Sequence, residues 1–118
     1  CGLATLEILK QNPRHFQIAE ARAKRLEIGT KHLIQKKGLS WTFNRVGTMW
    51  TLFFGPGPIR NFDDVKKSSI QTFSKFFQYL LSKNIYIAPS AFEANFLSSA
   101  HSERDIDETL KAIESFVN

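Results

Sequence analysis

The chain has 118 residues, of which 42% are hydrophobic and 23% charged, with a net charge of +5 and one cysteine. This length suits a single domain, residues 1–118, and the composition is ordinary for a globular protein. No apolar run approaches the roughly 20 residues that cross a bilayer, so no membrane segment is expected. The lone Cys1 excludes an internal disulfide, which favours a reducing compartment.

The charge is divided unevenly along the chain. Residues 1–60 carry a net charge of +7, whereas residues 61–118 carry −2. A basic half is typical of either a nucleic-acid-binding protein or a solvated helix face. We expect no nucleic-acid partner, because the chain contains no zinc-finger spacing, RNP-like strand or glycine-rich phosphate loop. No metal site is expected either, since His15 and His32 lie far from other residues at ligand spacing.

Two helices are predicted at the start of the chain. Residues 1–12 have the pattern of the end of a helix, which stops at Asn12-Pro13. The next helix is predicted from about Pro13 to Lys37, with Gly38 as its C-cap. The Gly29-Thr30 pair is a place where this helix could kink.

A β-hairpin is predicted over residues 41–54. Two strand-like runs flank Gly47-Thr48, a glycine-first pair that suits a two-residue type II′ turn. This register pairs Phe43 with Leu52 and Arg45 with Trp50 on one face, and Trp41 with Phe54 beyond them. That apolar face demands a cover.

The second half predicts helices that cover this small sheet. Asn61 resembles an N-cap, and the following helix has an apolar stripe, formed by Phe73, Phe76, Phe77, Leu80 and Leu81. We expect this helix to lie over the hairpin. Short strands are predicted at residues 85–87 and near 94–98, and a last helix begins at Ser102. The fold class is therefore α+β, with a small, mainly antiparallel sheet under helices.

Glu93 is the candidate functional residue. It stands between Phe92 and Phe96, and a carboxylate among aromatic side chains must be solvated by a cleft, paired or protonated. The residue types alone favour a surface glutamate in a turn or a structural ion pair over an active-site role. Ser90, Ser98 and Ser99 have no evident base beside them in the sequence, so nucleophilic catalysis is not supported.

Several blocks of the sequence resemble the C-terminal part of glutamate-1-semialdehyde 2,1-aminomutases. They occur in the family's order across nearly the whole chain, and the most specific are the Pro-Ser-x-Phe-Glu-Ala block at 89–94 and Ala-His-Ser-Glu at 100–103. The resemblance implies the C-terminal small domain of a fold type I pyridoxal-phosphate enzyme. Residues 1–12 would then be the end of a helix that leads from a missing large domain.

The resemblance also implies an activity and a role for Glu93. The family are homodimers that isomerise glutamate 1-semialdehyde to 5-aminolevulinate in tetrapyrrole synthesis, using pyridoxal phosphate and pyridoxamine phosphate. Glu93 matches a family residue that reaches the active-site cleft, where a carboxylate disfavours a second acidic group on the substrate. Ser90 and Phe92 beside it are candidate cleft-lining residues. The compartment implied is the cytoplasm or the plastid stroma.

No catalytic or coenzyme-binding residue is predicted in this chain. The Schiff-base lysine of such enzymes belongs to the large domain, and the lysines here fall on helix faces and ends, where they stay hydrated. We therefore expect the isolated chain to bind no coenzyme, to have no turnover, and to self-associate through uncovered apolar surface. The rival interpretations are the same domain of another class III aminotransferase and a stand-alone basic binding module.

Overall fold

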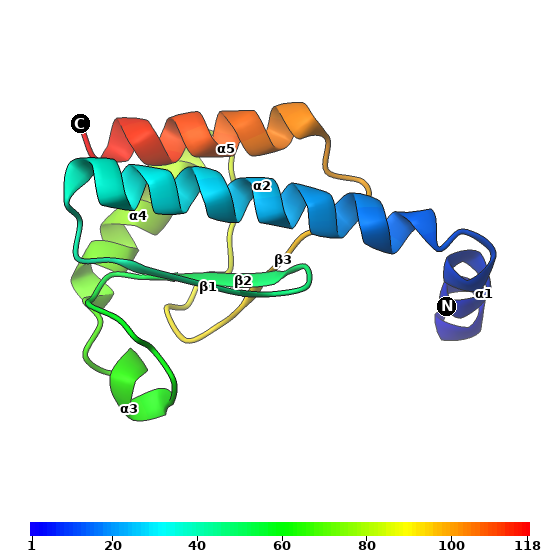
Figure 1. Ribbon diagram of the computed structural model, residues 1–118, viewed down its shortest axis with the longest axis horizontal. Helices are drawn as coiled ribbons and strands as arrows, with labels where there is room; N and C mark the ends of the chain where they lie inside the picture. Colours follow the sequence, from blue (N-terminus) through cyan, green and yellow to red (C-terminus); the bar gives the residue numbers. More distant parts are fainter.

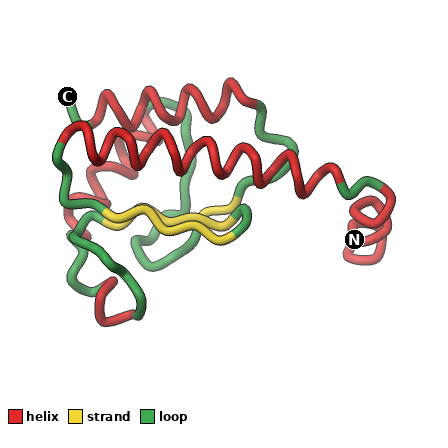
Figure 2. Tube along the Cα trace, viewed as in Figure 1, coloured by secondary structure: helices red, strands yellow, loops and turns green.

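The computed structural model describes residues 1–118 and has the predicted α+β architecture. A three-stranded antiparallel sheet has the order β1-β2-β3, and α2 and α5 lie together on one side of it (Figures 1 and 2). The elements in chain order are α1 (Gly2–Gln11), α2 (Arg14–Lys37), β1 (Thr42–Val46), β2 (Met49–Phe53), α3 (Phe62–Val65), α4 (Ile70–Ser82), β3 (Asn95–Phe96) and α5 (Glu103–Phe116). No helix is long and apolar enough to span a membrane.

The hairpin has the predicted register. Phe43 is opposite Leu52 and Arg45 is opposite Trp50. Gly47 has a φ of +57° while Thr48 does not have a positive φ, the combination that defines a type II′ turn. Trp41 and Phe54 lie just outside the strands, yet their rings meet edge to face with centroids 4.7 Å apart.

The cover of the hairpin differs from the prediction. The helix that lies along β1 is α2, whereas α4 reaches only the end of the hairpin, where Phe76 packs against Trp41 and Phe54. The apolar stripe of α4 is also narrower than predicted, because Leu81 is exposed. The buried hydrophobic cluster joins α2, the sheet, α4 and α5: Leu26, Leu33, Phe43, Trp50, Leu52, Phe54, Phe73, Phe76, Leu80, Ile87, Ile106, Ala112 and Ile113.

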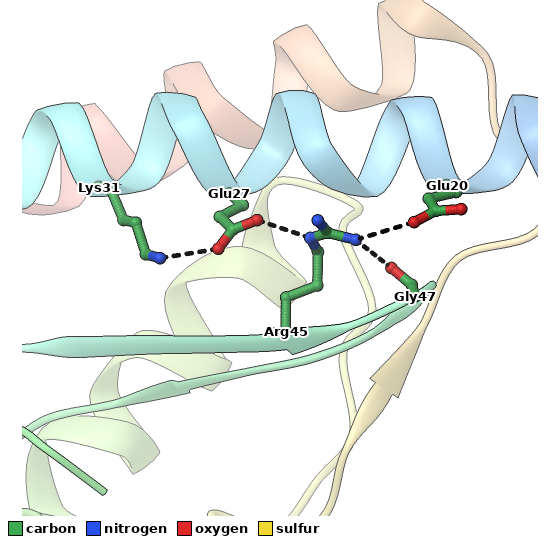
Figure 3. Close-up of polar contacts among 5 residues, drawn as sticks. All are labelled: Glu20, Glu27, Lys31, Arg45 and Gly47. Carbon is green, nitrogen blue, oxygen red and sulfur yellow. Dashed lines mark hydrogen bonds and ion pairs between the residues drawn. The ribbon is translucent and has the colours of Figure 1, made fainter.

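An ion-pair network fixes α2 to the sheet (Figure 3). The guanidinium of Arg45 donates from Nε to Glu27 Oε2 over 2.6 Å and from one terminal nitrogen to the Gly47 carbonyl, also over 2.6 Å. Lys31 donates to the other oxygen of Glu27 over 2.7 Å. Both Arg45 and Glu27 are mostly buried. The one charged residue of β1 that faces the helix is therefore paired with a carboxylate.

The packing of α5 on α2 depends on a glycine. A Cβ built on Gly29 would lie 2.6 Å from a methyl carbon of Leu110, so only glycine admits that side chain as it stands. The helix continues unbroken through Gly29-Thr30, and Gly38 ends it in the left-handed conformation, with φ 60°. Gly29 therefore serves close packing and does not interrupt the helix.

Two sequence predictions are wrong in detail. One helix was expected after Asn61, but Asn61 caps the four-residue α3 and Ser69 caps a separate helix, α4, by accepting a hydrogen bond from the Thr72 amide. Residues 85–87 form no strand, because the Ala88 amide that could continue a ladder donates to the Asn95 side chain over 2.8 Å. Ile87 is nonetheless buried, so this extended segment contributes to the core.

The first helix stands apart from the rest of the molecule. Figure 1 shows α1 beyond the end of α2, away from the sheet and the other helices. None of its residues is buried, and Leu3, Leu6 and Ile8 are all exposed. This helix has no tertiary packing of its own to stabilise it.

Candidate functional site: the loop that carries Glu93

The segment from Ala88 to His101 contains the candidate site, and β3 lies in its middle. Its first part projects on the side of the sheet away from α2 and α5 (Figure 1). β3 then pairs with β2, with Asn95 opposite Trp50, and the Leu97 amide donates to the Thr48 carbonyl over 3.1 Å. The middle of the loop is therefore attached to the sheet.

Glu93 lies at the end of a tight turn. Its amide donates to the Ser90 carbonyl over 3.2 Å, and its own carbonyl accepts from the Thr51 hydroxyl at 3.5 Å, the outer limit for a hydrogen bond. The residue is exposed, and its carboxylate makes no hydrogen bond or salt bridge within the chain. Among the alternatives left open by the sequence, the exposed side chain fits a solvated glutamate on a turn, and no ion pair to it forms within these 118 residues.

The neighbours of Glu93 shape the turn. Ser90 is half-buried, and its hydroxyl accepts from the Phe92 amide over 3.2 Å. The Phe92 ring is half exposed and packs against Phe62 of α3, with centroids 5.7 Å apart. The three predicted site residues thus lie on one turn, with α3 behind it.

A cavity of about 270 Å³ lies behind the loop and is lined by none of these three residues. It is bounded by the extended segment 85–88, by residues 94–97, and by the first turns of α5. Ten of its fourteen lining residues are hydrophobic. This mostly hydrophobic lining is typical of a gap in the core, and the cavity is separate from the turn that carries Glu93.

The end of the segment makes contacts that sequence reasoning missed. The Ser99 hydroxyl lies 2.9 Å from His15 Nδ1, and the Ser99 carbonyl accepts from Arg22 over 2.8 Å. The Ser98 hydroxyl lies 3.2 Å from His101 Nδ1. Each of these two serines therefore lies beside an imidazole. The Nδ1 of His101 already accepts from the Ser98 amide over 3.0 Å, and no carboxylate orients either ring as in a catalytic triad. The contacts of Ser99 attach the loop to α2, and no spacing could reveal a contact between residues 84 positions apart.

Two further kinds of reactive site to consider in the chain are a metal-binding cluster and a desolvated lysine. No cluster of three or more His, Cys, Asp or Glu could hold a metal ion. All ten lysines are exposed. An exposed lysine keeps its charge and its water, whereas a lysine that forms a Schiff base must be desolvated or held near a second cation.

Comparisons with solved structures define the class of protein to which this fold belongs. A β-phenylalanine aminotransferase from Variovorax paradoxus matches with a TM-score of 0.73 at 26% identity, over 88% of this chain and 23% of that one. A glutamate-1-semialdehyde aminomutase from Pseudomonas aeruginosa PAO1 matches with a TM-score of 0.79 at 16% identity, over 87% and 23%. The fold is that of the C-terminal part of fold type I pyridoxal-phosphate aminotransferases.

Sequence comparison narrows the class to one family. The chain is 47% identical over 112 residues to a glutamate-1-semialdehyde 2,1-aminomutase of Thermus thermophilus and 46% identical over 114 residues to that of Persephonella marina. These alignments cover 95% and 96% of this chain but 26% of each relative. The resemblance seen in the sequence blocks is confirmed: the chain is homologous to about a quarter of a glutamate-1-semialdehyde 2,1-aminomutase. No family model matches it.

Proposed function

We propose that the chain is the C-terminal small domain of a pyridoxal-phosphate-dependent aminomutase that isomerises glutamate 1-semialdehyde to 5-aminolevulinate for tetrapyrrole synthesis. The identity of 47% over 112 residues with the Thermus thermophilus aminomutase carries this proposal. Because the chain spans about a quarter of that relative, the proposal includes a large domain on the same polypeptide. It also includes a homodimer, and the cytoplasm or plastid stroma as the site of action.

Glu93 is proposed to select the substrate. Its side chain is exposed, and its carboxylate makes no hydrogen bond or salt bridge within the chain. The first part of the loop that carries it lies on the side of the sheet away from α2 and α5 (Figure 1). A negative charge at the wall of a cleft repels a second carboxylate on the substrate, which glutamate has and its 1-semialdehyde lacks. Ser90 and Phe92, on the same turn, are proposed to line that wall.

The coenzyme is proposed to bind outside this chain. When bound, pyridoxal phosphate supplies the carbonyl group and the electron sink for transfer of an amino group. The exposure of all ten lysines of this chain supports this placement. The isolated chain is therefore proposed to bind no coenzyme and to have no turnover. A Schiff-base absorbance band that disappears when one lysine is replaced would contradict this part.

A chimeric enzyme tests the proposal. The matching quarter of the Thermus thermophilus aminomutase would be replaced by residues 1–118, and formation of 5-aminolevulinate would be measured. We expect an active, coenzyme-loaded enzyme, since the cleft wall and the domain contacts should be preserved at this identity. The control carries the corresponding segment of the Variovorax paradoxus aminotransferase, which has the same fold, and should form little product. A chimera that folds and binds coenzyme but makes no 5-aminolevulinate would refute the proposed function.

The two rival interpretations receive less support. If the chain is the small domain of another class III aminotransferase, the chimera should transfer amino groups between different substrates. In that case Glu93→Gln should leave the discrimination against glutamate unchanged. A basic binding module needs free cationic groups, but two of those on α2 face acids of the second half of the chain. Arg25 lies 2.7 Å from Asp107, and Lys36 lies 3.9 Å from Glu114. Salt-sensitive binding of the isolated chain to nucleic acid would revive that interpretation.

A further inference from the structure

We propose that Asn95 is a positioning residue that fixes the Glu93 turn on the sheet, and that Phe62 supports the same turn from the outside. The inference rests on the proposed role of Glu93 for its functional consequence, but its structural part stands independently. Asn95 touches neither substrate nor coenzyme in this assignment. It acts through the backbone of the loop.

The Asn95 side chain joins both arms of the loop. Its Oδ1 accepts from the Ala88 amide over 2.8 Å, which ties the residue after the turn to the residue before it. Its Nδ2 lies 3.5 Å from the carbonyl of Trp50, its register partner on β2. The first contact is a well-formed hydrogen bond, and the second is at the limit of one. The amide group thus takes the place of the missing strand pairing at residues 85–87.

The backbone in between has few other supports. The turn from Ser90 to Glu93 is closed by local hydrogen bonds, and its only hydrogen bond to the sheet is the 3.5 Å contact from Thr51. The Phe62 ring packs on the ring of Phe92, one residue before Glu93, with the two centroids 5.7 Å apart. Because Asn95 is two residues after Glu93, its 2.8 Å hydrogen bond restrains the backbone from which the Glu93 side chain projects.

Removing the amide tests the structural part on the 118-residue chain. Asn95→Ala leaves the Ala88 amide without an acceptor, so we expect hydrogen exchange across residues 88–94 to accelerate roughly tenfold or more while exchange in α2 and α5 is unchanged. Asn95→Asp keeps an acceptor oxygen and should retain most of the protection at Ala88. The matched control is Asn44→Ala, which removes a 3.0 Å hydrogen bond to the Ile59 carbonyl and should leave residues 88–94 unaffected. Equal exchange in the wild type and Asn95→Ala would overturn the inference.

The chimeric enzyme tests the functional part. We expect Asn95→Ala and Phe62→Ala to lower the preference for glutamate 1-semialdehyde over glutamate in the same direction as Glu93→Gln, with less effect on kcat, and Asn95→Asp to restore it. If Glu93→Gln lowers the preference and Asn95→Ala does not, the positioning role is refuted and the proposed function survives. If Glu93→Gln has no effect, the proposed role of Glu93 fails, and the exchange measurements alone decide whether Asn95 fixes the turn.

Discussion

Arg45 supplies the charged contact between α2 and the sheet, beside the hydrophobic core that joins them. It points from β1 toward the helix and meets Glu27 at 2.6 Å, while Glu20 lies farther off at 3.9 Å (Figure 3). Lys31 contacts the other oxygen of Glu27, so one carboxylate is paired with two cations. The hydrogen bond from Lys31, and then that from Arg45, lower the pKa of Glu27 below its ordinary value of 4.5.

The lowered pKa of Glu27 makes stability depend on acidity. As the pH falls, Glu27 takes up its proton at about pH 4.5 in the unfolded chain but only at a lower pH in the folded chain. Between these two pH values the unfolded state therefore binds more protons. The contribution is complete above about pH 4.5, the ordinary pKa, and is lost as the pH falls through the lowered value. We expect Glu27→Gln to reduce the free energy of unfolding by about 1–2 kcal/mol at pH 7. Urea titrations at pH 7 and pH 3 should show that difference shrinking in acid.

Glu20→Gln is the matched control for this prediction. Glu20 is on the same helix and approaches the same arginine, but its side chain is 62% exposed and 3.9 Å away. Such a pair contributes little, so its removal should change stability by less than about 0.5 kcal/mol at either pH. An equal loss in the two variants, or a Glu27→Gln effect that does not depend on pH, would show that the Glu27 pair is not what links stability to acidity.

At the scale of elements, the contact of α2 with α5 is set by Gly29 and Leu110. Gly29→Ala should gain up to about 1 kcal/mol from helix propensity, yet the new Cβ would overlap the leucine side chain. We expect Gly29→Ala to be neutral or destabilising in the wild type but to stabilise the chain by about 0.5–1 kcal/mol in the Leu110→Ala background. Urea unfolding of the two single variants and the double variant measures this coupling.

The control for the glycine is an exposed helix position where nothing is close. Gly2 of α1 has no neighbouring atom within 4 Å of a built Cβ, so Gly2→Ala should show no coupling to Leu110→Ala. Additive effects of Gly29→Ala and Leu110→Ala would mean that the helices separate slightly without cost, and would remove the packing explanation for the glycine.

Elements defined by local chemistry could be predicted from the sequence, and those decided by distant side chains could not. The hairpin register followed from Gly47-Thr48, because the turn type fixes which residues face each other. Residues 85–87 have the composition of a strand, but the Ala88 amide after them bonds to the side chain of Asn95 instead of a neighbouring strand. The hydrophobic periodicity of the sequence does not reveal such a side-chain contact. Likewise, the break before α4 depends on Ser69 capping a new helix within a continuous polar stretch.

The candidate site was predictable only in part, for a similar reason. The Ser90–Glu93 turn follows from Pro89-Ser90 and its neighbours, so the placement of the three residues together is local. Some of the contacts that support the turn are not local: Phe62 comes from α3, some 30 positions earlier, and Thr51 from the middle strand. A resemblance between sequences identifies Glu93, whereas the residues that support it emerge only from the fold.

At the scale of the whole molecule, the uneven charge has a structural use. The basic half contains α2 and the acidic half contains α5, and the two helices lie side by side (Figure 1). Arg25 contacts both Glu103 and Asp107 across that boundary. These pairs are exposed and individually weak, but together they orient one helix on the other. Part of the uneven charge along the chain therefore serves contact between its two halves.

The N-terminal end of the molecule carries an exposed apolar surface. Leu3 is 73% exposed and Leu6 66%, both on a helix that buries nothing, and Phe16 at the start of α2 is 58% exposed. An apolar surface of this kind favours association, because burial of each such side chain releases about 1.5–3 kcal/mol. We expect the isolated chain to self-associate, with a weight-average mass in sedimentation equilibrium that rises with concentration.

Charged substitutions on α1 distinguish this surface from the open side of the sheet. Leu3→Glu with Leu6→Glu should abolish the concentration dependence, because a like-charged helix cannot bury itself against a second copy. The matched control, Val46→Glu with Phe96→Glu, places the same charges on exposed residues of the sheet and should leave association intact. If only the sheet variant dissociates, the contact lies on the side of the sheet that carries the Glu93 turn. A strictly monomeric wild type at every concentration would show that α1 remains solvated and that its exposed leucines drive no association.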